Sequence, residues 1–252
     1  MDRLEFLDSN FFLGKPVVAG YEAYSDVCEL MAEMGGAGVV GGLVWHVAQM
    51  DSSPVEGNRL LAEAIRGFDN LWGCWTILPP QTREVIRPGF FEQMKLNRIF
   101  ALRAYPEHHR FMLRRSVFGS FLDELVERRI PLLIPIGKDA TWPIVYDLLE
   151  EAPELTVVLC DLTTWGCDRL TWPLMAKYPN VHVETSFLSL HEGELEGMVN
   201  EFGGDRMLFG SGFPEKYVEG PALQLTHADI SDEDKRKIAS GNLRRLISEV
   251  KL

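Results

Sequence analysis

The sequence predicts a single (β/α)8 barrel domain over residues 1–252. Two observations indicate this fold: eight short apolar segments alternate with longer amphipathic ones, and the 252 residues match the roughly 250 typical of such a barrel. An open, doubly wound parallel sheet is the second choice. No G-x-G-x-x-G motif follows the first expected strand, which weakens the dinucleotide-binding form of that sheet.

The eight expected strands are short runs rich in β-branched or aromatic residues, as is typical of parallel strands covered on both faces. They are Leu4–Asp8, Gly38–His46, Leu71–Leu78, Arg98–Arg103, Ile130–Ile136, Leu155–Cys160, Val181–Glu184 and Arg206–Gly210. Helical spacing of apolar residues predicts helices between them. These are Ala19–Met34, Ser116–Arg129, Thr141–Glu151, Trp165–Lys177 and Glu192–Phe202. A last helix begins at Ser231, and Gly241-Asn242 is expected to form a corner in it.

Charge and composition exclude several classes of partner. The formal charge of −12 disfavours a surface for nucleic acid or for an anionic membrane, because both are bound by clustered Lys and Arg. No apolar run reaches 18 residues, and the first residues lack the pattern of a secretory signal. We therefore expect a cytoplasmic protein; its oligomeric state, monomer or homo-oligomer, is left open.

Four segments carry a resemblance to a known family. They are Phe6–Gly14, Asn180–Ser186, Arg206–Pro214 (R-M-L-F-G-S-G-F-P) and the ending Ile230–Leu246. Together they resemble the amidohydrolase-related family of TIM-barrel, metal-dependent hydrolases and decarboxylases. The resemblance spans nearly the whole chain and implies a barrel that acts on a small organic acid or cyclic amide.

The resemblance also implies five metal-ligand positions, and this chain departs from the pattern at most of them. The D-x-H-x-H pattern of the first strand reads Asp8-x-Asn10-x-Phe12, and the remaining ligand positions fall on Pro135, Asp161 and Gly212. A catalytic zinc needs about three protein ligands. We therefore expect no tightly bound metal and no other cofactor; a weakly held Mg or Mn ion is the alternative.

Polar residues at the ends of the expected strands are the candidate site, since barrel enzymes work at that end. His46 and Asp161 are the candidate catalytic bases. The alternatives are a rim histidine bonded to backbone and a counter-ion for Arg103.

The candidate ligand-binding residues are Asn10, Arg103, Glu184 and Ser211. Arg103 could bind a substrate carboxylate or form a salt bridge inside the barrel. Ser211 fits a structural turn better than a nucleophile elbow.

Two further features concern the rim of the expected pocket. One of His108 and His109 is expected at its entrance, and Trp165 and Phe213 are candidates for apolar walls. Two hypotheses on function follow: a hydrolase or decarboxylase that works on a small, carboxylate-bearing molecule without the usual zinc, or a catalytically inactive relative that binds a metabolite or serves as a scaffold.

Overall fold

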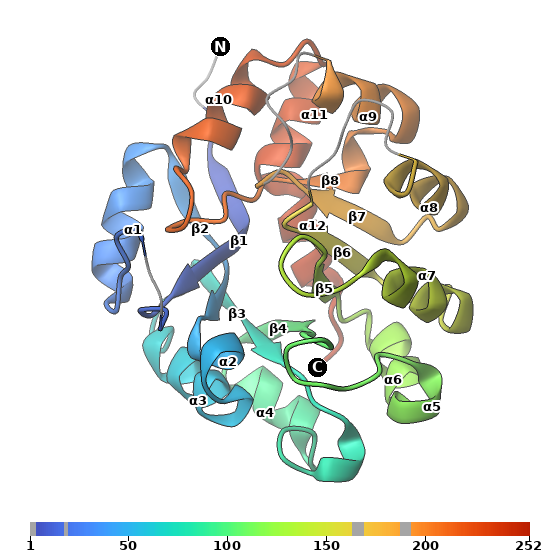
Figure 1. The fold of residues 1–252 in the computed structure, drawn as a ribbon. Helices are drawn as coiled ribbons and strands as arrows, with labels where there is room; N and C mark the ends of the chain where they lie inside the picture. Colours follow the sequence, from blue (N-terminus) through green and yellow to red (C-terminus); the bar gives the residue numbers. More distant parts are fainter. Residues whose placement is uncertain (1–3, 18–19, 163–168, 187–192) are drawn as a thin grey trace.

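The computed structural model describes residues 4–17, 20–162, 169–186 and 193–252 and has eight parallel strands in one sheet (Figure 1). The strand order is β1 to β8 in sequence order, with helices around the outside, so the predicted barrel is confirmed. The strands are β1 (Phe6–Leu13), β2 (Val39–His46), β3 (Leu71–Thr76), β4 (Ile99–Arg103), β5 (Leu132–Pro135), β6 (Val157–Cys160), β7 (Val181–Glu184) and β8 (Met207–Leu208).

The segment after β8 joins the last strand to the first. Ser9 N donates to Phe209 O at 2.8 Å, Gly212 N donates to Asn10 O at 2.8 Å, and Phe12 N donates to Phe213 O at 3.0 Å. Strand β8 itself is only two residues long. The backbone hydrogen bonds of residues 209–213 bring the segment after it against β1.

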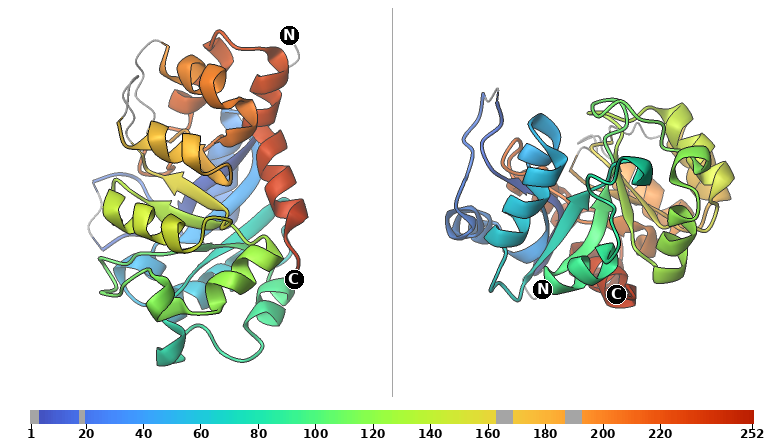
Figure 2. Two further views of the ribbon diagram at one scale, coloured as in Figure 1. Left: turned by 90° about the vertical axis from the view of Figure 1, so that its right-hand side faces the viewer. Right: turned by 90° about the horizontal axis from the view of Figure 1, so that it is seen from below.

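The helices pack around the strands, as two further views show (Figure 2). The α-helices are α1 (Val27–Gly36), α2 (Ala48–Asp51), α3 (Pro54–Ala64), α4 (Phe90–Leu96), α5 (Arg115–Phe118), α6 (Phe121–Arg128), α7 (Trp142–Glu151), α8 (Thr171–Lys177), α9 (Glu194–Phe202), α10 (Glu219–His227), α11 (Asp232–Arg236) and α12 (Asn242–Glu249). Short 3₁₀ turns cover η1 (Pro80–Thr82) and η2 (Gly204–Arg206), and η3 (Lys237–Gly241) is a π-helical turn. None of the helices in these described ranges is long and apolar enough to cross a membrane.

Helix α1 begins later than the expected start at Ala19. Asp26 caps it, because its Oδ1 accepts hydrogen bonds from Cys28 N at 2.7 Å and Glu29 N at 3.0 Å. Residues 20–25, which have the apolar spacing of a helix, therefore lie in the loop after β1. Residues 18–19 lie outside the described ranges.

The predicted corner at Gly241-Asn242 is wrong. Both residues have right-handed helical backbone angles, and the π-helical turn follows α11 directly and runs straight on into the first residue of α12 with no intervening loop. The Nδ2 of Asn242 donates to Gly204 O at 2.8 Å and to Met207 O at 2.7 Å, so two backbone carbonyl groups beside β8 satisfy the hydrogen-bond donors of this buried amide. Ser231 is the N-cap of α11, so this helix starts where it was predicted, and the Ser231 hydroxyl accepts from Asp234 N.

The predicted first strand, Leu4–Asp8, begins too early and ends too early: β1 runs from Phe6 to Leu13, and all eight of its residues are buried. Its pairing with β2 shifts between Asp8 and Phe11, which marks a bulge where the polar residues of the mouth begin. Gly42 on β2 permits this close approach: its φ is +154°, and a Cβ there would lie 2.0 Å from Asp8 O.

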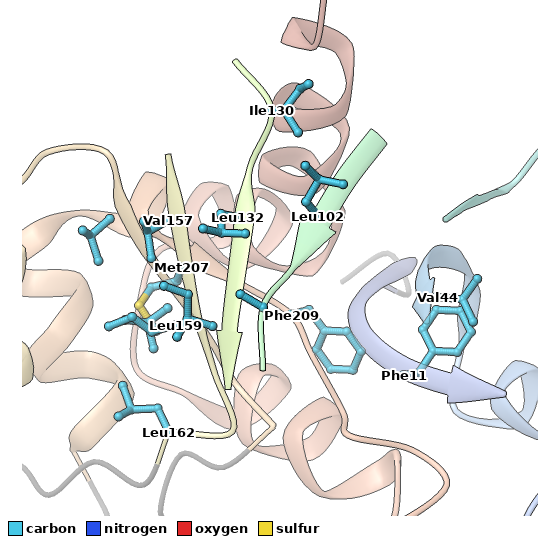
Figure 3. Close-up of a cluster of buried hydrophobic side chains, with 14 of the residues drawn as sticks. Phe11, Val44, Leu102, Ile130, Leu132, Val157, Leu159, Leu162, Met207 and Phe209 are labelled. Atoms are coloured by element: carbon cyan, nitrogen blue, oxygen red, sulfur yellow. The ribbon is translucent and has the colours of Figure 1, made fainter. Parts of the chain in front are cut away.

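Two groups of apolar side chains form the core. One lies between the strands and the surrounding helices and includes Leu102, Leu132, Val157, Leu159 and Met207 (Figure 3). The other fills the barrel itself, where α12 contributes Leu243, Leu246 and Ile247. The interior is therefore packed at the end that α12 covers, and the polar residues collect at the opposite end.

Candidate functional site

Four polar side chains meet at the carboxyl ends of the strands, and we refer to them as the mouth cluster: Asn10 in β1, Arg103 at the end of β4, Asp161 directly after β6 and Glu184 at the end of β7. Each is at most 1% exposed. The backbone of Gly212 bonds to Asn10, so the predicted meeting of Asn10, Arg103, Asp161 and Gly212 at one mouth is confirmed.

Asn10 is the centre of the mouth cluster. Its Oδ1 accepts a hydrogen bond from Arg103 Nη1 at 2.8 Å. Its Nδ2 lies 3.1 Å from Asp161 Oδ1, 3.2 Å from Glu184 Oε1 and 3.4 Å from Ser186 Oγ. The amide thus connects one cation to two carboxyl groups, which only a side chain with both an acceptor and donors can do.

Arg103 forms an internal ion pair. Its Nη2 donates to Asp161 Oδ2 at 3.0 Å, and its guanidinium carbon lies 4.7 Å from the centre of the Trp45 ring and 5.5 Å from that of Tyr105. The side chain is 0% exposed. Of the two interpretations from the sequence, the salt bridge inside the barrel is the one that this geometry shows, and Asp161 is its counter-ion. Direct contact of Arg103 with a ligand stays a prediction.

Glu184 is held by hydrogen-bond donors on both oxygens. Oε1 accepts from Asp161 N at 2.7 Å and from Ser186 Oγ at 2.6 Å, and Oε2 accepts from Ser186 N at 2.6 Å. A Cβ at Gly210 would lie 2.1 Å from Oε2, so only glycine leaves room for this carboxyl group. Burial, and next the charge of Asp161, raise the pKa of Glu184 to about 7.

Asp8 is a second buried carboxyl group beside the mouth cluster. Its Oδ1 accepts from Asn10 N at 2.9 Å and from Ser211 N at 3.1 Å, and its Oδ2 accepts from the Ser211 hydroxyl. Burial raises the pKa of Asp8 to about 6. Asp8 is absent from the residues predicted for the site, although it stands first in the pattern Asp8-x-Asn10-x-Phe12, which was the available signal.

The hydroxyl of Ser211 also accepts from Phe213 N at 3.0 Å. This bond within the turn fits the structural interpretation of Ser211. Its role in ligand binding stays a prediction.

His46 does not join the mouth cluster. Its neighbours Trp45 and Val47 both belong to the core inside the barrel, so alternation along the chain directs His46 away from that core. Its Nδ1 accepts from Ala48 N at 3.1 Å, and burial lowers its pKa. The structure thus shows the backbone-bonded rim histidine that was the alternative to a catalytic base.

An open pocket of about 490 Å³, which we call the mouth pocket, lies against the mouth cluster. Trp45, whose ring covers Arg103, forms one of its walls, and Lys138 forms another. It is lined by Phe12, Pro16, Val17, Tyr21, Trp45, Val47, Met50, Asp51, His108, Lys138 and Glu215. His108 is the member of the histidine pair at the entrance. Phe213 packs instead against Tyr24, with ring centres 5.5 Å apart, and Trp165 lies outside the described residues.

Two lysines at the mouth are absent from the predicted site. Lys138 Nζ lies 3.7 Å from Asp161 Oδ1 and also pairs with Glu215, and its side chain is 19% exposed. Lys216 Nζ donates to Ser186 O at 3.3 Å, and burial lowers the pKa of Lys216 to about 8. The signal for Lys138 was its place three residues after Pro135, at the carboxyl end of β5.

The described residues do not fit a divalent metal ion at this mouth. Among residues 4–17, 20–162, 169–186 and 193–252, no group of three or more His, Cys, Asp or Glu side chains is placed to hold one. The side chains of Phe12 and Pro135 have no atom that can bind a metal ion, and the Oδ1 of Asn10 already accepts from Arg103. Whether the purified protein carries zinc stays a prediction.

Comparisons with known proteins agree with this fold. The family model Amidohydro_2, described as amidohydrolase, matches residues 21–247, and no curated protein matches the chain. An uncharacterized TIM-barrel protein from Bordetella bronchiseptica is similar in structure, with a TM-score of 0.72, 18% identity, and 98% of this chain and 99% of that one covered. Amidohydrolase 2 from Bifidobacterium longum subsp. infantis has a TM-score of 0.69 and 17% identity over 98% and 100% of the chains.

A dihydroxybenzoic acid decarboxylase from Polaromonas sp. JS666 is also similar, with a TM-score of 0.66 and 17% identity over 97% of each chain. That structure holds manganese and the inhibitor 2-nitroresorcinol. At these identities, the structural likenesses show the fold.

Proposed function

Because the chain belongs to the amidohydrolase family, whose model matches residues 21–247, we propose that it binds a small organic acid in the mouth pocket without a metal-bound water. The observation that carries the proposal is the position of Lys138, which lines the pocket and whose ammonium group lies 3.7 Å from Asp161 Oδ1. The pocket volume of about 490 Å³ falls within the range of small-molecule sites.

The walls of the mouth pocket determine what kind of acid fits. The rings of Phe12 and Trp45 lie 4.8 Å apart by their centres, and those of Phe12 and Tyr21 lie 6.3 Å apart. These rings offer apolar surface for the body of the ligand, and Lys138 offers a positive charge for its carboxylate. A ligand carboxylate would replace Glu215 as one partner of Lys138, and Asp161 would stay in place because Arg103 holds it.

The test is a screen of small aromatic and aliphatic acids for thermal stabilisation, followed by calorimetric titration of the best ligand. We expect Lys138→Met to weaken binding about tenfold or more at low salt, since a charge pair in a partly enclosed cleft exceeds the ~1 kcal/mol of an exposed pair. The carboxamide analogue of the ligand should bind wild type about tenfold more weakly than the acid does, and Lys138→Met should bind the two about equally.

Lys177→Met is the matched control, because Lys177 is an exposed lysine on α8 whose partner is Glu150. It should leave affinity unchanged. Equal affinity of wild type and Lys138→Met, or equal binding of acid and carboxamide to wild type, would refute the proposal. An Arg103→Lys variant tests direct recognition by Arg103: unchanged affinity would assign Arg103 to internal ion pairing only.

A second candidate function is hydrolysis or decarboxylation of the bound acid. The observation that favours it is the pair of buried carboxyl groups, Glu184 and Asp8, whose pKa values near 7 and 6 suit proton transfer at neutral pH. The test is incubation of each ligand found with the protein, with product detected by NMR. Turnover that disappears in both Glu184→Gln and Asp8→Asn would support an enzyme; stable ligand over days would support a binding protein.

A further inference from the structure

The guanidinium of Arg103 lies between two of the positions at which the resemblance implies metal ligands. It donates to Asn10 Oδ1 at 2.8 Å and to Asp161 Oδ2 at 3.0 Å. We propose that this guanidinium is the permanent cation of the barrel mouth and takes the place of a divalent ion. The inference does not depend on which ligand the mouth pocket binds.

Burial makes such a cation necessary. Asp8, Asp161 and Glu184 are all at most 1% exposed, and a carboxylate that is removed from water needs a compensating charge or donor. Arg103 is itself 0% exposed and lies beneath the Trp45 ring, so water cannot take over its role. The buried cation that pairs with Asp161 Oδ2 is therefore part of the chain, and the partly exposed Lys138 lies 3.7 Å from the other oxygen of Asp161.

The planar shape of the guanidinium also sets the direction of the Asn10 amide. Because Nη1 donates to Oδ1, the Nδ2 group of Asn10 is turned toward Asp161 and Glu184. A metal ion would need the Oδ1 of Asn10 and the Oδ2 of Asp161, which are the atoms that Arg103 already binds, while the Oδ1 of Asp161 accepts from Asn10 Nδ2. The ion and the guanidinium thus compete for the same acceptors and repel each other.

The first experiment removes the cation and supplies it again from solution. Arg103→Ala should lower the thermal midpoint by about 10 °C, since it removes the buried cation of Asp161 and leaves only the partly exposed Lys138, at 3.7 Å, beside that carboxylate. Ethylguanidinium at about 10 mM should restore at least half of the loss, whereas ethylammonium at the same ionic strength should not, because it lacks the planar pair of donors. Both compounds are added to wild type as a control.

A second set of variants separates charge compensation from packing. Arg103→Ala combined with Asp161→Asn should be more stable than Arg103→Ala alone, since the uncompensated charge is gone. A role in packing alone predicts that the two losses add and that neither cation rescues. That outcome would overturn the proposal.

The third measurement uses wild-type protein and therefore holds even if Arg103→Ala does not fold. After treatment with chelator and dialysis, titration with Mn²⁺ or Zn²⁺ alone should show no site with a dissociation constant below about 1 mM at the mouth. One micromolar site per chain that disappears in Asp161→Asn would refute the inference. If the protein bound no organic acid, all three results expected here would be unchanged. The role of Arg103 and the binding of an organic acid are therefore tested separately.

Discussion

The buried carboxyl group of Glu184 predicts a specific dependence of stability on pH. Burial and the neighbouring Asp161 raise its pKa from 4.5 to about 7 in the folded protein. A proton therefore binds the folded state more tightly than the unfolded state. The stabilisation is complete below pH 4.5 and is lost as the pH rises through about 7.

The magnitude follows from the two pKa values. One pKa unit corresponds to about 1.4 kcal/mol, so the rise from 4.5 to about 7 corresponds to roughly 3 kcal/mol. Glu184→Gln has no proton to lose at this position. Between pH 4.5 and 8, wild type should therefore lose roughly 3 kcal/mol more free energy of unfolding than the variant.

The assay is urea unfolding of wild type and Glu184→Gln at several pH values from 4.5 to 8. Asp8, whose pKa is raised to about 6 by burial, contributes to both proteins and cancels in the difference. Glu201→Gln, an exposed position on α9, is the control and should follow wild type. Parallel curves for wild type and Glu184→Gln over the whole range would refute the reasoning.

Three further predictions concern single positions. Gly210→Ala should lower the free energy of unfolding in urea by about 1–3 kcal/mol, because its Cβ would lie 2.1 Å from Glu184 Oε2. Gly197→Ala, in the open part of α9, should be neutral or stabilising, and equal effects of the two substitutions would contradict the packing argument. Asn10→Leu should cost at least about 3 kcal/mol, since it leaves Arg103 and two carboxyl groups without their shared partner, and a loss below 1 kcal/mol would show that the amide is dispensable. Elemental analysis after dialysis should find far less than one zinc per chain, and one zinc per chain would overturn this expectation.

The sequence by itself determined the barrel and the position of its mouth. Short apolar strands alternate with amphipathic helices along the chain. The spacing of apolar residues within each element follows from which of its faces is buried, so both kinds of element can be recognised without coordinates. Placing the ends of strands at one mouth then brought Asn10, Arg103, Asp161 and Gly212 together correctly. The departures from the metal-ligand pattern could also be read directly from residue identity.

Only the tertiary structure decided which of these residues interact and which the solvent reaches. His46 was predicted for the site but lies off the inner face, because the direction of a side chain depends on strand register, and a shift of one residue reverses it. The choice between a ligand-binding and an internal role for Arg103 required the positions of Asn10, Asp161 and Trp45, which are far apart in sequence. Likewise, only the structure placed Lys138 and Asp8 in the site. Their hydrogen bonds, ion pairs and burial depend on neighbours that are distant in the sequence.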